Sequence, residues 1–175
     1  MSNTDTQQSG LSLSKEWAIR QLVFSHILDE IGGFLAGLGI RYMPIKGGNL
    51  IATGLAERIL QRPMGDLDIL VDRNNYDKAV AHLGRLDKVK LSSSGWDFER
   101  PMYYTVGEAP IPVEICYQLN RPERFHLPTE ELFDRGKKVS EYCFLPAPED
   151  ALLVTICHVL VDIGFRFLYY TFDDV

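Results

Sequence analysis

The apolar residues of this chain recur at two different spacings, and the alternation between them predicts a domain of mixed helices and strands. Residues 14–38 carry apolar side chains at helical spacing, and Gly39 follows where the helix should end. Pro148 and two acidic residues open a strongly apolar helix that should run to about residue 163. Three shorter helices are expected at residues 49–58, 75–86 and 130–135.

The strand-like segments are short and rich in β-branched and aromatic residues. They predict strands at residues 40–45, 67–71, 89–91, 96–98, 103–106, 111–117 and 142–145. The order is a helix, then β-α-β-α, then several antiparallel-type strands, then a helix. We therefore expect an α+β fold, in which a small mixed β-sheet is flanked by helices.

The length of 175 residues fits one domain with short additions. Residues 1–13 are polar and are expected to form a disordered tail. Residues 14–145 should form the main domain, and residues 146–175 a C-terminal helical segment.

Composition narrows the function classes. The formal charge of −6 disfavours general binding of long nucleic acid, because such binding comes from Lys and Arg at phosphates. Three cysteines without a close pair make no disulfide framework and indicate a cytoplasmic protein. The polar first residues do not resemble a signal peptide, and no apolar run is long enough to span a membrane.

Two aspartates stand at the start of the strand expected at residues 67–71. Because side chains alternate along a strand, Asp66 and Asp68 point to one face while Leu67 and Ile69 point to the other. Adjacent carboxylates repel each other unless a cation lies between them, most simply a divalent metal with oxygen ligands. A solvated edge or turn is the alternative interpretation.

A third carboxylate is expected on a neighbouring strand, because two aspartates hold two metals poorly and phosphoryl chemistry commonly uses two. Glu114 offers one, since Val113 and Ile115 lie on the opposite strand face. A carboxylate within so apolar a strand is unusual without a partner. A surface position on an edge strand would also account for it.

A candidate phosphate site precedes the aspartates. Gly47 and Gly48 allow backbone N–H groups to approach an anion, although they also suit an ordinary turn. Asn49 is expected to cap the short helix that follows. Lys46 and Arg62 could each contact phosphate, or instead pair with the carboxylates.

The remaining metal-ligand residue types have simpler explanations. His158, on an apolar helix, is more typical of a core or hydrogen-bonded histidine than of a ligand. Cys116, Cys143 and Cys157 lack the Cys-x-x-Cys spacing of a zinc site. The aromatic residues between 165 and 172 favour packing or an oligomer contact over base stacking.

Taken together, these motifs resemble the signature of the polymerase-β-like nucleotidyltransferase superfamily, and most of all its bacterial branch called uncharacterised nucleotidyltransferases. The resemblance rests on the Lys-Gly-Gly turn at Lys46, on Arg62 and on the Gly-Asp-Leu-Asp-Ile-Leu-Val run from Gly65. It continues through Glu114 and into the Pro-Glu-Asp segment and apolar helix that carry His158.

The resemblance implies a polymerase-β-like fold in which Asp66, Asp68 and Glu114 hold two Mg²⁺ ions and carry the catalysis. It further implies that a nucleoside triphosphate binds along Gly47 and Gly48. Two departures stand out: Gly47-Gly48-Asn49 replaces the usual Gly-Ser turn, and the C-terminal helical region is shorter than the family's.

Two functions fit these features. The first is a metal-dependent nucleotidyltransferase that moves a nucleoside monophosphate to an acceptor hydroxyl, on a small molecule or protein rather than a long nucleic acid. The second is a nucleotide-binding or antitoxin-like regulatory module that acts with a partner protein. In both, residues 165–175 are expected to contact another chain, as a homodimer or with a hetero-partner.

Overall fold

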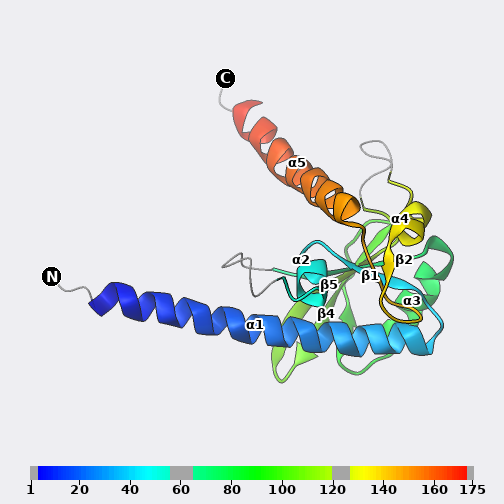
Figure 1. Ribbon diagram of the computed structural model, residues 1–175, viewed down its shortest axis with the longest axis horizontal. Helices are drawn as coiled ribbons and strands as arrows, with labels where there is room; N and C mark the ends of the chain where they lie inside the picture. The colour runs from blue at the N-terminus through cyan, green and yellow to red at the C-terminus, as the bar shows by residue number, and fades with distance from the viewer. Residues whose placement is uncertain (1–3, 56–64, 120–126, 173–175) are drawn as a thin grey trace.

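A five-stranded mixed sheet forms the centre of the molecule (Figure 1). The computed structural model describes residues 4–55, 65–119 and 127–172, with their side chains between residues 18 and 160. The sheet has the order β1-β2-β5-β4-β3, in which β2 and β5 are parallel and the other neighbours are antiparallel. Its strands are β1 (Tyr42–Ile45), β2 (Leu67–Val71), β3 (Val89–Leu91), β4 (Glu99–Val106) and β5 (Ala109–Cys116).

Helices cover this sheet, and two long ones extend beyond it in Figure 1. The described helices are α1 (Thr4–Gly37), α2 (Gly47–Ala52), α3 (Tyr76–Leu83), α4 (Thr129–Arg135) and α5 (Pro148–Phe172), with a 3₁₀ turn, η2 (Arg73–Asn75). A small two-stranded sheet pairs β6 (Lys137–Lys138) with β7 (Phe144–Leu145). This arrangement confirms the expected α+β fold.

One sheet face packs against α1. Ile27, Ile31 and Leu35 of this helix are fully buried at helical spacing, as the sequence predicts. They join a core with the inward residues of the sheet, namely Leu67, Ile69, Val71, Met102, Tyr104, Val113 and Ile115. Leu22, by contrast, is 71% exposed, so the buried stripe among the described side chains begins only at Phe24.

The opposite sheet face is divided between apolar packing and charge. Met43, Ile45, Leu70 and Cys116 pack on this face against Leu132 and Phe133 of α4. Because side chains alternate, Asp68 and Glu114 share this face with Leu70 and Cys116. The apolar contacts with α4 therefore fix the sheet beside the acidic residues.

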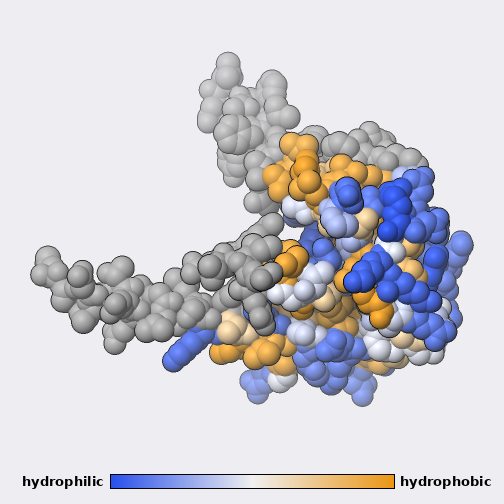
Figure 2. Space-filling view, in the orientation of Figure 1, coloured by the Kyte–Doolittle hydropathy of each residue, from blue (hydrophilic) through white to orange (hydrophobic). Residues whose placement is uncertain are grey.

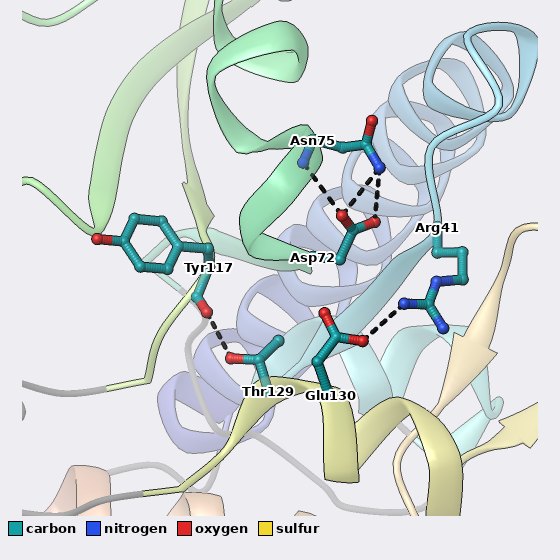
Figure 3. A network of polar contacts seen from close by, with 6 residues as sticks. All are labelled: Arg41, Asp72, Asn75, Tyr117, Thr129 and Glu130. Carbon is teal, nitrogen blue, oxygen red and sulfur yellow. Dashed lines mark hydrogen bonds and ion pairs between the residues drawn. The ribbon is translucent and has the colours of Figure 1, made fainter.

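Polar contacts join α4 to the end of β5 and to Arg41, which precedes β1, and another set closes the loop after β2 (Figure 3). The Thr129 hydroxyl donates a hydrogen bond to the Tyr117 carbonyl oxygen, and Arg41 donates to Glu130 over 2.8 Å. The Asp72 carboxylate accepts from the backbone N–H of Asn75 at 3.1 Å. These contacts fix α4 and the loop after β2 at the C-terminal ends of β2 and β5.

Some expected boundaries differ from the structure. The first helix begins at Thr4 rather than at residue 14, because polar residues carry no apolar period yet can continue a helix. The strand expected at residues 96–98 is only a bridge between Trp96 and Glu99. The described helices include none that combines the length and the apolar character needed to cross a membrane.

Candidate active site

The three acidic residues predicted to hold metal lie together on one sheet face. The parallel register of β2 and β5 places Asp68 opposite Glu114, and Asp66 lies two residues before Asp68 on the same side. One carboxylate oxygen of each residue lies within 4.8 Å of the others. The Asp68 side chain is 4% exposed, whereas Asp66 and Glu114 are half-buried.

Lys46 supplies a cation to this cluster. Its ammonium Nζ lies 2.6 Å from Oδ1 of Asp68, and its side chain is 21% exposed. Burial alone lowers the pKa of Lys46, but the Asp68 carboxylate outweighs burial and the net pKa is raised. Of the two roles that the sequence left open for Lys46, the structure shows pairing with a carboxylate.

The backbone of Lys46 is strained. Its φ of 50° and ψ of −122° make it the one non-glycine residue with a positive φ in the described part of the chain. Such a conformation costs on the order of 1–3 kcal/mol and is most easily adopted by glycine. Strained backbone of this kind is often found at functional sites.

Burial and mutual repulsion raise the pKa values of two of the carboxyl groups. Burial, followed by the charges of Glu99 and Asp68, raises the pKa of Glu114 to about 8. Burial and the charge of Asp68 also raise the pKa of Asp66, while Lys46 and His158 oppose the rise. A crowded set of hard oxygen donors, costly to ionise without a cation, suits a hard divalent cation.

The Gly47-Gly48-Asn49 segment forms the first turn of α2. Lys46 occupies the N-cap position and Asn49 lies inside the helix, so the expected cap at Asn49 is wrong. A Cβ atom on Gly48 would lie 3.1 Å from the Asp68 carbonyl oxygen, so a larger residue would crowd the packing of this turn on β2. Oδ1 of Asn49 is buried without a hydrogen-bond partner among the described residues.

A cavity of about 750 Å³ opens in front of these groups. One wall carries Lys46, Asp66 and Asp68, and the facing wall is the first three turns of α5, including His158. Figure 2 shows the surface hollowed between α5 and the region of α2. The cavity is within the size range of ligand sites, and its lining combines charged groups with apolar side chains of α5.

Other charged residues at the site were missed from the sequence. His158 lines the cavity and acts to lower the pKa of Asp66, a position that the spacing of its apolar helix does not predict. Glu99 acts on Glu114 because β4 pairs with β5 in antiparallel fashion, and sequence spacing does not reveal this pairing. Arg135 and Lys137 line the far part of the cavity, and Arg135 is held by the buried Asp150 at 3.0 Å.

Two further expectations have different outcomes. Arg62 lies outside the described residues. Within the described part of the chain, the only group of acidic, histidine and cysteine side chains arranged to hold a metal is the three-carboxylate cluster. Cys116, Cys143 and Cys157 are free thiols, and no zinc site forms there among the described residues.

The fold and the acidic cavity together define a nucleotidyltransferase-like domain. The structure is similar to that of a candidate nucleotidyltransferase from Thermotoga maritima, with a TM-score of 0.54 and 12% identity over 83% of this chain and 91% of that chain. At this identity the similarity is evidence for the fold alone. The chain belongs to the uncharacterised nucleotidyltransferase family, whose model matches residues 11–169. No curated protein matches it.

Proposed function

We propose that this protein is a metal-dependent nucleotidyltransferase that moves a nucleoside monophosphate from a triphosphate to an acceptor hydroxyl. The observation that carries the proposal is the convergence of Asp66, Asp68 and Glu114, whose carboxylate oxygens lie within 4.8 Å of one another. Asp66 and Asp68 of this cluster line a large cavity. In this reaction the acceptor oxygen forms a bond to the α-phosphorus as the bond to pyrophosphate breaks.

The carboxylates would hold two Mg²⁺ ions, with Asp66 and Asp68 shared between them and Glu114 on one. Bound Mg²⁺ would neutralise phosphate charge and lower the pKa of the acceptor hydroxyl. The support is chemical: all three donors are carboxylates, and the pKa values of Asp66 and Glu114 are raised in the metal-free protein even with Lys46 nearby. Glu114 could also accept the acceptor's proton.

The triphosphate would lie along the turn that begins α2. Lys46, Gly47 and Asn49 all line the cavity, next to the aspartates. The side-chain amide N–H of Asn49 could donate a hydrogen bond to a phosphate oxygen. Gly48 keeps this turn close to β2, and Arg62 is proposed to join the phosphate contacts.

The acceptor is proposed to be a small molecule or a protein side chain. The formal charge of −6 disfavours a long nucleic acid. Apolar residues of α5 and its approach, including Leu145, Ala151 and Leu152, line the cavity away from the carboxylates. The free thiols favour the cytoplasm as the place of this activity.

Incubation with each labelled nucleoside triphosphate and Mg²⁺ tests the proposal, with pyrophosphate release and label transfer as readouts. A cell extract supplies the acceptor. We expect pyrophosphate release that is lost when EDTA is added and lost in Asp66→Asn. It should be retained in Asp87→Asn, which makes the same charge change at an exposed position. Release that persists in Asp66→Asn would refute the site.

The regulatory alternative draws support from α5, where Leu153, Ile156 and Leu160 are exposed and available to a partner. The proximity of Glu114 to the aspartates favours the enzyme instead. The same assay separates the two, because a regulatory module would bind triphosphate by calorimetry without releasing pyrophosphate.

A further inference from the structure

The cation that the acidic cluster needs is already present in part, as the ammonium of Lys46. We infer that Lys46 is an internal counter-ion that a divalent metal must displace from Asp68, and that the displaced ammonium then serves the triphosphate. The inference rests on the proposed function and deepens it, because it couples the binding of metal and nucleotide through one side chain.

The geometry makes the competition direct. The Lys46 Nζ lies 2.6 Å from Oδ1 of Asp68, and the Asp68 side chain is 4% exposed, so this oxygen is shielded from water and occupied by a charged donor. A divalent ion that binds the same carboxylate would lie close to the ammonium, and like charges at such separation repel strongly in a partly buried site. Metal binding therefore favours departure of the Lys46 head group.

The displaced side chain has a defined place to go. Lys46 lines the cavity together with Gly47, where we propose that the triphosphate binds. The lysine stem is flexible and carries three rotatable donors, so the head group can move while the strained backbone of the turn stays in place. An anionic substrate would then give the ammonium a new partner, which strengthens metal binding reciprocally.

Titration with Mn²⁺ alone, followed by calorimetry, measures the competition without any turnover. We expect Lys46→Met to bind Mn²⁺ at least about fivefold more tightly than the natural protein, the low end of typical coupling between linked sites. The matched control is Lys88→Met, which removes a lysine paired with Glu30 at 3.0 Å and which should change the affinity by less than about twofold. Equal affinities for Lys46→Met and the natural protein would overturn the inference.

Amine acylation of the natural protein tests the movement directly and does not depend on whether the variant folds. Mn²⁺ should increase the rate of modification at Lys46, read by mass spectrometry, because the ammonium loses Asp68 as a partner. Adding a non-hydrolysable triphosphate with Mn²⁺ should lower the rate again, while Lys88 stays constant as the internal reference. A rate at Lys46 that Mn²⁺ leaves unchanged or lowers would overturn the inference.

The outcomes separate this inference from the proposed function. Mn²⁺ binding that is lost in Asp66→Asn but equal in Lys46→Met and the natural protein would refute the counter-ion role and leave the metal site standing. Absence of Mn²⁺ binding from all of these proteins, with or without triphosphate, would refute the metal site itself and the counter-ion role with it.

Discussion

Neutralising the two aspartates should have opposite effects on the stability of the metal-free protein, because their partners differ. Asp66 is half-buried and repelled by Asp68, so Asp66→Asn should leave the free energy of unfolding unchanged or raised. Asp68→Asn would leave Lys46 without its partner at 2.6 Å. This substitution should lower the free energy of unfolding by about 2 kcal/mol, which is less than the loss expected for a fully buried ion pair.

Urea denaturation in EDTA measures this difference, and pyrophosphate release should be lost in both variants. A destabilised Asp66→Asn together with a stabilised Asp68→Asn would contradict the assignment of Lys46 to Asp68. A crowded acidic cluster read from sequence alone predicts stabilisation in both cases. The ion pair with Lys46 reverses the sign of the effect that Asp68→Asn is expected to have on the free energy of unfolding.

The stability of the metal-free protein should also depend on pH through Glu114. Its pKa in the folded protein is about 8, above the ordinary value of 4.5, so the folded state holds this proton more tightly than the unfolded state. The resulting stabilisation is full below about pH 4.5 and is lost as the pH rises through about 8.

Melting temperatures in EDTA between pH 5.5 and 8.5 test this dependence against Glu114→Gln, which resembles the protonated side chain. The variant should melt slightly above the natural protein at pH 5.5 and further above it at pH 8.5. Saturating Mg²⁺ should narrow the gap at pH 8.5, because bound metal compensates the ionised carboxylate. A gap that does not change with pH would rule out Glu114 as the titrating group.

The sequence predicts those parts of the candidate site whose signal lies within a single strand or turn. Asp66, Asp68 and Glu114 could be found because strand alternation places them on a face, and their convergence then needs only that two strands pair in parallel. The Lys46–Asp68 contact and the position of His158 depend on how a turn and a distant helix pack, which no spacing encodes.

At the scale of elements, the turn at the start of α2 is held by close packing. A Cβ atom on Gly48 would lie 3.1 Å from both the Asp68 carbonyl oxygen and Leu67 Cδ1. Gly48→Ala should therefore lower the free energy of unfolding by about 1 kcal/mol, since overpacking exceeds the helix propensity gained. It should also weaken triphosphate binding, because the turn must shift away from β2.

Gly33→Ala in α1 is the matched control, because a Cβ atom there meets nothing within 4 Å. It should raise the free energy of unfolding by up to about 1 kcal/mol through helix propensity, with triphosphate binding unchanged. Denaturation and calorimetry on the two variants give the comparison. Equal effects of both substitutions on stability would mean that β2 does not constrain the turn.

The same elements show where pattern reasoning succeeds. The strand at residues 67–71 was predicted with its observed bounds, because its apolar run is framed by clear turn and helix signals. The prediction of a strand at residues 96–98 was wrong, because two aromatic residues gave this segment the composition of a strand. The pairing of β4 with β5 begins only at Glu99. Strand pairing depends on partners that composition does not reveal.

At the scale of the whole molecule, the helix-strand order was enough to predict an α+β fold, but it did not predict the sheet order. β2 pairs with β5 across the intervening α3, β3 and β4. This crossover brings Asp68 beside Glu114 and thereby creates the site. Function in this fold therefore depends on long-range topology more than on any single motif.

The described face of α5 leads to a prediction about assembly. Leu153, Ile156 and Leu160 follow one another at helical spacing and are 41%, 45% and 55% exposed, and Figure 2 shows hydrophobic residues gathered over this part of the helix. Residues 165–175 continue the chain from there, and their side chains lie outside those described. Because such an apolar surface usually marks an interface, we propose a two-fold homodimer through α5.

Light scattering at micromolar concentration should give twice the chain mass. The double substitution of Ile156 and Leu160 by Glu should give the single mass, whereas Val139→Glu, at another exposed apolar position, should leave the dimer intact. A monomeric natural protein would refute the dimer.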